Sequence, residues 1–227
     1  MPLPPSLQEA RTAVSPVPAA PNGAAGVAAS GPSASESIPA SPPAQLPRFF
    51  VKAVIATQDP GFWSHDGTDT GRAAGALVDS LRHGRAVAGG STITEQLAKL
   101  STAQGAPRSV KSRLFEALTA RRIELSLSKE QILAEYSARL PFGNGFTGLD
   151  AAAAGYFGKT PADLTLAESA LLAGLPDAPG KLNPYRHLEA AQARQHAILD
   201  HLAASGQITS EEARQAATEP MRLRPAP

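Results

Sequence analysis

The stretch TITEQLAKL, residues 92–100, decides the fold class, because it combines a helix start signal with one apolar helix face. Thr92 and Glu95 have the spacing of a capping box, in which a hydroxyl and a carboxylate satisfy free backbone N–H groups at a helix start. Ile93 and Leu97 follow the spacing that places side chains on one side of a helix. The stretch therefore predicts an amphipathic helix.

The same signals recur on both sides of this stretch. Further capping boxes are expected from Ser128 with Gln131, Thr165 with Glu168 and Thr209 with Glu212. Helical periodicity of apolar residues is found over residues 46–57, 70–84, 110–127, 129–140, 166–175, 188–206 and 211–217. Alternating strand patterns are scarce, so the sequence predicts an all-α or mainly α domain over residues 47–220, followed by a tail, 221–227.

The first 46 residues have a different composition. Eleven of the 21 prolines fall between Pro2 and Pro47, and no aromatic residue precedes Phe49. Such a segment buries too little apolar surface to offset its chain entropy, so residues 1–46 are predicted to be a disordered Pro/Ala/Ser-rich linker. Neither a signal peptide pattern nor an apolar run of about 18 residues is visible in the sequence.

Charge and cysteine content narrow the function classes. The chain has 21 Lys and Arg against 20 Asp and Glu, a formal net charge of +1, so no global field attracts a polyanion and no nucleic-acid partner is expected. Without cysteine there is no disulfide and no thiolate metal site.

Two glycine-rich segments interrupt the helical patterns. They are GGST, residues 89–92, and PFGNGFTG, residues 141–148, and both are expected to be irregular loops. Glycines let backbone N–H groups approach a ligand, and a helix N-terminus favours an anion. Each segment by itself is more often a turn or a cap than a ligand site.

Taken in chain order, five segments resemble the motifs of the peptidoglycan glycosyltransferases of family 51. The segments are TQDPGFWSHDGTD (57–69), GGSTITEQLAKL (89–100), SRLFEALTARRIE (112–124), SKEQILAEYSARLPFGNGFTGLDAAAAGYFGK (128–159) and LTLAESALLAGLPDAPGKLNPYRH (164–187). The resemblance implies a mostly helical, lysozyme-like domain of two lobes. It also implies a place in the bacterial cell envelope, periplasmic or membrane-associated.

The family polymerises lipid II, so the resemblance implies lipid II and glycan strands as partners, together with the membrane surface or membrane-anchored cell-wall synthesis proteins. In the reaction, a general base takes a proton from the acceptor sugar's 4-hydroxyl, which attacks C1 of the donor as undecaprenyl diphosphate leaves. Basic residues and a divalent cation, Mg²⁺ or Mn²⁺, neutralise the leaving diphosphate. No residue is a certain metal ligand, and Glu116 is the candidate.

The family's general base, a glutamate, falls on Gln58. An amide has no basic lone pair near neutral pH, so a loss of about 10²–10⁴ in rate is expected. Glu116 is implied as the second carboxylate of the cleft, and Gln58, Glu95 and Glu116 are expected to face it together. Asp59 and Glu95 are candidates for a relocated base, although capping is the favoured role of Glu95, by about three to one.

Residues that the resemblance assigns to substrate or diphosphate binding are Ser91, Thr92, Gln96, Lys99, Arg113, Lys129 and Asn144. Several positions depart from the family pattern. Arg113 stands where lysine is usual, and Ser112 replaces arginine. Ala134 and Ala138 replace a glutamate and an asparagine.

Three interpretations remain open at this point. The chain is a working glycosyltransferase with a relocated base, or a catalytically inactive binding or regulatory module of cell-wall synthesis. The third is glycan hydrolysis on the same fold, which needs a pair of carboxyl groups and is weakened by Gln58 as well. We expect weak or absent activity. If the missing base is the main defect, Gln58→Glu should increase lipid II polymerisation by about 10² or more, and if Ser112, Ala134 and Ala138 have also disabled the cleft it should do little alone.

Overall fold

The structure is a computed structural model that describes residues 46–83, 90–101 and 110–226. The predicted linker 1–46, apart from its last residue, lies outside these ranges, and so does Gly89. In chain order the elements are α2 (Arg48–Gln58), α3 (Thr70–His83), α4 (Ile93–Ser101), α5 (Val110–Ser126), α6 (Lys129–Arg139), β1 (Pro141–Gly143), β2 (Phe146–Thr147), α7 (Leu149–Phe157), η1 (Pro161–Asp163), α8 (Leu166–Gly174), η2 (Leu175–Asp177), α9 (Leu188–Ala204) and α10 (Ser210–Thr218). The described part of the chain is mainly helical, which confirms the predicted fold class.

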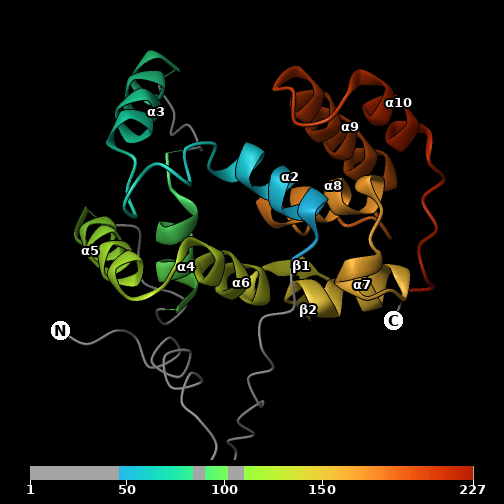
Figure 1. Ribbon diagram of the computed structural model, residues 1–227, viewed down its shortest axis with the longest axis horizontal. Coiled ribbons are helices and arrows are strands. Elements are labelled where there is room, and N and C mark those ends of the chain that lie inside the picture. The colour runs from blue at the N-terminus through green and yellow to red at the C-terminus, as the bar shows by residue number, and fades with distance from the viewer. Residues whose placement is uncertain (1–45, 84–89, 102–109, 227) are drawn as a thin grey trace, which may run out of the picture.

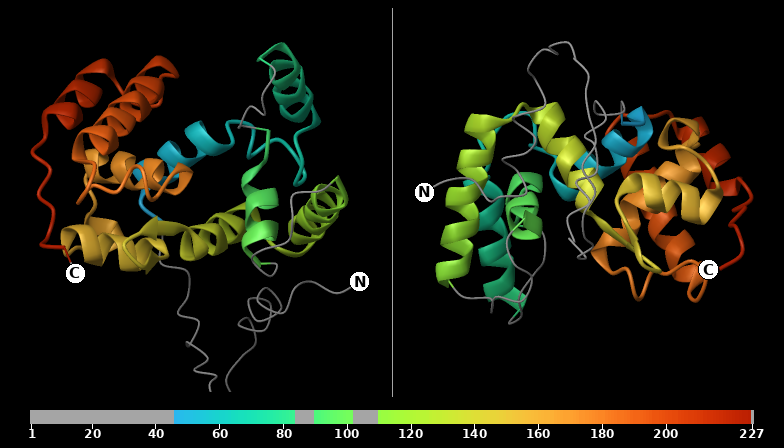
Figure 2. Two further views of the ribbon diagram at one scale, coloured as in Figure 1. Left: turned by 180° about the vertical axis from the view of Figure 1, so that it is seen from behind. Right: turned by 90° about the horizontal axis from the view of Figure 1, so that it is seen from below.

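The helices form two lobes on either side of a central pair, α2 and α6 (Figure 1). Helices α3, α4 and α5 lie on one side of this pair, and α7, α8, α9 and α10 lie on the other. Helix α2 packs against α8 and α9, whereas α6 packs against α4 and α7. The views from behind and from below in Figure 2 keep the same division into two lobes.

Helix α2 is held in the core by its apolar side. Phe50, Ala53 and Val54 are at most 1% exposed, as their three- and four-residue spacing along one side of a helix predicts. Burying a large apolar side chain contributes about 1.5–3 kcal/mol. The helix ends at Gln58, because Asp59 has a non-helical backbone with φ −157° and ψ 77°. Packing of α2 therefore fixes the position of Gln58, whose side chain forms hydrogen bonds with Gln96 of α4 and Asp177 of η2.

The predicted capping boxes are present. The hydroxyls of Ser128, Thr165 and Thr209 each accept the backbone N–H three residues later, and the side chain at that position accepts the N–H of the cap residue. Thr92 and Glu95 exchange the same two hydrogen bonds at the start of α4, at 3.0 and 3.1 Å. These helix starts were predictable because all partners lie within one turn of the chain.

The glycine-rich segment 141–148 is not the irregular loop that the sequence predicts. It folds as a short antiparallel hairpin of β1 and β2, with Gly143, Asn144 and Gly145 at positive φ values of 83°, 53° and 79°. Glycine, and to a lesser degree asparagine, adopts this backbone region at low cost. The strands are too short to show an alternating pattern, which is why the sequence does not reveal them.

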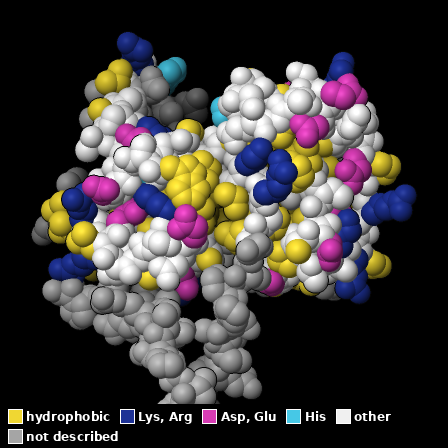
Figure 3. Space-filling view, in the orientation of Figure 1, with side chains coloured by type: hydrophobic (Ala, Val, Ile, Leu, Met, Phe, Trp, Pro, Cys, Tyr) yellow, Lys and Arg dark blue, Asp and Glu magenta, His cyan; other side chains and the backbone are white. Residues whose placement is uncertain are grey.

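The surface mixes charges and apolar side chains. Figure 3 shows acidic and basic side chains interspersed over one face, which agrees with the net charge of +1. Helix α5 also exposes Leu114, Leu118 and Leu125, at 61%, 59% and 78%. The described residues thus leave one apolar side of α5 in contact with solvent.

Candidate active site

The carboxylate of Asp59 anchors the loop that follows α2. It is 0% exposed and accepts hydrogen bonds from Arg72 Nη1 at 3.0 Å, from His65 Nε2 at 2.9 Å and from the backbone N–H of Ile93 at 3.0 Å. The backbone N–H of Gly67 donates to His65 Nδ1 at 3.1 Å, so the imidazole proton is on Nε2 and points to Asp59. Buried carboxylates require such donors. Asp59 thus joins this loop to α3 and α4.

Lys129, predicted to bind a diphosphate, is bound within the protein. Its Nζ donates to the backbone oxygen of His65 at 2.6 Å and to Glu124 Oε1 at 2.7 Å, and it lies 4.5 Å from the centre of the Phe62 ring. The Thr94 hydroxyl donates to the same Glu124 oxygen at 2.6 Å. Because the Lys129 and Glu124 side chains are only 19% and 9% exposed, the ammonium charge serves an internal ion pair here.

Gln58 takes part in a line of hydrogen bonds that links α6 and α4 to η2 and α9. Its Nε2 donates to Asp177 Oδ1 at 2.7 Å, and its Oε1 accepts from Gln96 Nε2 at 3.3 Å. The Tyr136 hydroxyl donates to Gln96 Oε1 at 2.9 Å, and Arg194 Nη2 donates to Asp177 Oδ2 at 2.6 Å. We call Tyr136, Gln96, Gln58, Asp177 and Arg194 the amide relay. Gln96, predicted to bind substrate, is a member of it.

Glu95 stands on the first turn of α4, next to the amide relay in the chain. Its Oε2 accepts the backbone N–H of Thr92, so the capping role that the sequence favours is confirmed. Burial raises the pKa of Glu95, the hydrogen bond from Thr92 opposes this shift, and the negative charges of Glu116 and Asp59 add to it. The charges of Glu95 and Glu116 thus influence each other, while the expectation that Gln58, Glu95 and Glu116 face one cleft stays a prediction.

The residues predicted to bind the diphosphate are held in different ways. Ser91 just before α4, Lys99 on α4 and Arg113 on the first turn of α5 are exposed. Thr92 is 0% exposed, and its hydroxyl donates to the backbone oxygen of Gly67 at 2.7 Å. Consequently Ser91, Lys99 and Arg113 are accessible to a ligand, whereas Thr92 is used inside the fold.

The amide of Asn144 is engaged within its own lobe. Its Nδ2 donates to the Tyr156 hydroxyl at 2.9 Å and to Asn183 Oδ1 at 3.2 Å, and Asn183 Nδ2 donates back to Asn144 Oδ1 at 2.7 Å.

Ala134 is half-buried on α6, and Ala138 is exposed there. The two positions where the family pattern has polar side chains thus offer methyl groups only.

The donor set for the predicted cation is small. Glu116 is the candidate ligand, and the part of the chain that the structure describes contains no group of three or more His, Cys, Asp or Glu that could hold a metal ion. Mg²⁺ is commonly held by one or two carboxylates together with substrate phosphates and waters, so Glu116 would hold such an ion only alongside a bound diphosphate.

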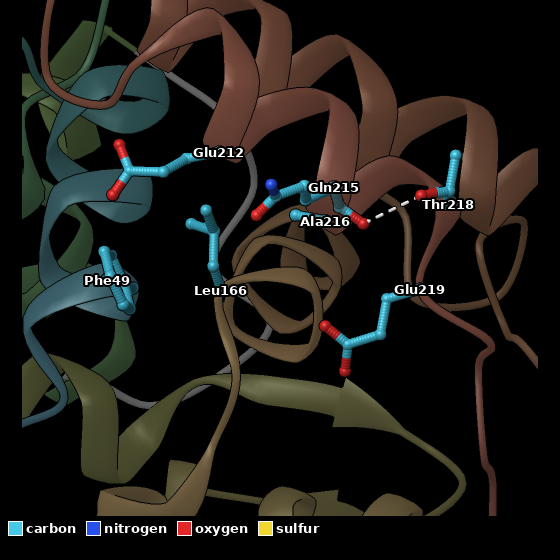
Figure 4. Close-up of a pocket in the computed structure, with 7 residues that line it drawn as sticks. All are labelled: Phe49, Leu166, Glu212, Gln215, Ala216, Thr218 and Glu219. Atoms are coloured by element: carbon cyan, nitrogen blue, oxygen red, sulfur yellow. Dashed lines mark hydrogen bonds between the residues drawn. The ribbon is translucent and has the colours of Figure 1, made fainter.

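A shallow hollow lies away from all of these residues, between α2, α8 and α10. Figure 4 shows its lining, which consists of Phe49, Leu166, Glu212, Gln215, Ala216, Thr218 and Glu219. Glu212 is the capping-box partner of Thr209, and the Thr218 hydroxyl donates to the backbone oxygen of Gln215 at 3.0 Å. Since it contains none of the predicted site residues, we do not assign the hollow to the active site.

Sequence comparison identifies the family. A family model described as transglycosylase matches residues 28–203. The chain belongs to the transglycosylase family. Penicillin-binding protein 1A of Aquifex aeolicus is 39% identical over 180 residues, which are 79% of this chain and 25% of that protein. Penicillin-binding protein 1C of Escherichia coli is 37% identical over 176 residues, or 78% of this chain and 23% of that protein.

The match to solved structures includes the crystal structure of penicillin-binding protein 1A from Haemophilus influenzae, at 29% identity and a TM-score of 0.41, covering 58% of this chain and 16% of that one. The chain spans about a quarter of the length of the two penicillin-binding relatives from Aquifex aeolicus and Escherichia coli. Within the described residues, no helix is both long and apolar enough to cross a membrane. The predicted family is confirmed.

Sequence reasoning missed two residues that shape this candidate site. Arg72 binds both Asp59 and the backbone oxygen of Gln58, the latter at 3.0 Å. Asp177 holds the amide of Gln58 from a position 119 residues further along the chain. The only available signal was that Asp177 lies inside the last family-like segment, which does not indicate its partner.

Proposed function

We propose that this chain is a transglycosylase-type module of peptidoglycan synthesis that binds lipid II and nascent glycan strands, with weak or absent polymerising activity of its own. The family model and the penicillin-binding relatives support the glycosyltransferase class and a cell-envelope location. We expect the module to work at the membrane surface or on membrane-anchored proteins of cell-wall synthesis.

The observation that carries the proposal is the state of Gln58. The reaction needs a base that takes a proton from the acceptor hydroxyl, and an amide cannot do so near neutral pH. Both ends of the Gln58 amide are also hydrogen-bonded, to Asp177 and to Gln96. The side chain can therefore neither accept the proton nor turn toward an acceptor sugar without breaking these bonds.

Asp59 does not supply the missing base in this proposal. Its carboxylate is fully buried, and Arg72, His65 and a backbone N–H occupy its oxygens. A base must reach the proton that it removes, either directly or through one water. Replacing Asp59 would also damage the loop, so a loss of activity in Asp59→Asn would not identify a base.

Glu95 supports a second candidate function, an active polymerase with a relocated base. Burial and the neighbouring charge of Glu116 raise its pKa, which makes the carboxylate a better proton acceptor than an ordinary exposed one. Against this, one of its oxygens is occupied by the Thr92 N–H. We favour the first candidate because the carboxylate already has a structural task.

Polymerisation of lipid II in detergent or vesicles separates the two candidates. We expect little or no product from the wild-type chain and no further change for Glu95→Gln. Robust wild-type activity that Glu95→Gln reduces about 10²-fold or more would instead establish the relocated base. Glu212→Gln is the matched control, since Glu212 is a capping-box glutamate on α10 in the other lobe.

Binding is measured separately from catalysis. If Arg113 helps to hold a diphosphate, Arg113→Ala should weaken the binding of lipid II about tenfold or more, since one charge-assisted contact is worth about 1.5–3 kcal/mol. Arg214→Ala is the control, because the Arg214 side chain on α10 is 75% exposed, and it should leave the affinity unchanged. Absence of lipid II binding at high micromolar concentration would contradict the proposed substrate.

A further inference from the structure

We infer that Asp177 is the positioning residue that fixes Gln58 as a neutral donor, so that a base at position 58 requires a change at position 177 as well. The inference rests on the proposed function only in taking position 58 as the place of the base. The structural evidence is the amide relay, in which Asp177 of η2 and Arg194 of α9 are linked by hydrogen bonds to Gln58 of α2. Restoring the carboxylate alone would therefore set two carboxylates against each other.

The two ends of the amide relay fix its direction. Asp177 at one end is a carboxylate, which accepts hydrogen bonds, and the Tyr136 hydroxyl at the other end donates to Gln96. Burial raises the pKa of Tyr136, and the negative charges of Asp177 and Asp59 act in the same direction, so its hydroxyl keeps its proton at neutral pH. Each amide between these ends must then present its oxygen toward Tyr136 and its NH₂ toward Asp177.

Asp177 itself is held in place from α9. Arg194 Nη2 donates to its second oxygen at 2.6 Å, and both side chains are about one-third exposed. Gly174 lets the Arg194 stem lie against the end of α8, because a Cβ at position 174 would come within 2.8 Å of Arg194 Cγ. This arrangement presents the other Asp177 oxygen to Gln58.

A glutamate at position 58 would lose the donor that Asp177 accepts. The charged or titratable groups near this position come from each surrounding element, and they are Asp59, Arg72, Glu95, Tyr136, Asp177, Arg194 and His201. Arg72 already serves Asp59 and the Gln58 backbone, and Arg194 serves Asp177. Two carboxylates at hydrogen-bond distance raise each other's pKa, or they separate and break the relay.

The test is thermal unfolding of the full chain and of three variants between pH 8 and pH 4: Gln58→Glu, Asp177→Asn and both together. At pH 7.5 we expect Gln58→Glu to lower Tm by about 2–6 °C, since a charge-assisted hydrogen bond is replaced by repulsion. In the double variant the asparagine amide can donate to the new carboxylate, so at least half of this loss should return.

The pH dependence has a definite sign. In the Gln58→Glu variant, Asp177 raises the folded-state pKa of the introduced carboxyl group above its unfolded value. The loss of Tm is therefore present above the folded-state pKa and disappears as pH falls to about 4. The matched control is Gln131→Glu, where the side chain serves a capping box that accepts either residue. A Gln58→Glu deficit that is independent of pH, or equal with and without Asp177→Asn, would overturn the inference.

Polymerisation of lipid II by the same variants tests the proposed function apart from this coupling. Greater product formation by the double variant than by Gln58→Glu alone supports both. If the double variant recovers Tm but makes no glycan, the coupling of Asp177 to Gln58 stands and the missing base is not the main defect. If Tm shows no coupling, the inference fails whatever the polymerisation result.

Discussion

Asp59 and Gln58 are neighbours in the chain, but the regions around them differ in what they retain. The buried carboxylate of Asp59 accepts hydrogen bonds from an imidazole, a guanidinium and the first backbone N–H of α4. At Gln58, an amide stands where a carboxylate is expected for chemistry, and its side-chain partners are Asp177 and Gln96.

The comparison shows that stability and catalysis depend on different residues. The Asp59 region joins three elements, so any change there costs stability. The Gln58 side chain is partly exposed between the lobes, and an amide can replace a carboxylate there as long as Asp177 is present to accept its hydrogen bond. The scaffold can therefore persist in a chain whose catalytic position has changed.

The largest loss of stability is expected for a substitution of Asp59. Asp59→Asn turns an NH₂ group toward buried donors and leaves Arg72 without its anion. Breaking a buried ion pair in this way typically costs about 3–5 kcal/mol, and we expect a loss of that size in urea unfolding. Asp66→Asn is the control, because Asp66 is 79% exposed and pairs with an exposed arginine. Equal stability of the two variants would contradict the anchoring role of Asp59.

A smaller loss is expected for Lys129→Met. This variant removes the ammonium from Glu124, which is 9% exposed, and from the backbone of the 59–67 loop, at an expected cost of about 2–4 kcal/mol. The double variant Lys129→Met with Glu124→Leu should recover part of the loss, because no unpaired charge stays buried. If Lys129→Met instead leaves stability unchanged and weakens only lipid II binding, Lys129 binds the ligand and does not stabilise the fold.

Local signals explain which parts of this molecule the sequence predicts. The capping boxes were predictable because each is complete within four residues, and the buried side of α2 follows from simple periodicity. The hairpin at 141–148 was not, since its strands are too short for a pattern. The amide at Gln58 could be recognised because neighbouring motif residues fix its place in the family pattern.

Partners distant in sequence explain what could not be predicted. Nothing near Lys129 indicates that its charge is taken up by Glu124 and the backbone of His65. Likewise, the link from Gln58 to Asp177 spans 119 positions and depends on how α2 packs between the lobes. Motif resemblance gives the chemistry that a position has in other chains, while the contacts decide whether the side chain is available for it here.

The smallest expected effect compares two glutamates with the same capping task, Glu95 and Glu212. Burial raises the pKa of Glu95, whereas the N–H and hydroxyl of Thr209 lower the pKa of Glu212. A raised folded-state pKa gives stability that is present below the unfolded pKa, about 4.3, and is lost as pH rises through the folded value. Glutamine serves the capping box as well as glutamate does.

Glu95→Gln should therefore raise Tm by about 1–3 °C at pH 7.5, with the difference shrinking toward zero near pH 4. For Glu212→Gln the expected sign is reversed. The lowered pKa of Glu212 stabilises the wild-type chain above about pH 4.3, and this stabilisation is lost as pH falls through the folded-state pKa. The variant should therefore have a lower Tm than the wild-type chain at pH 7.5 but not at low pH. Thermal unfolding of both variants over this pH range makes the comparison. A Tm decrease for Glu95→Gln at pH 7.5 would mean that the Glu95 charge is stabilised by its surroundings, and that the carboxylate is less basic than a relocated base requires.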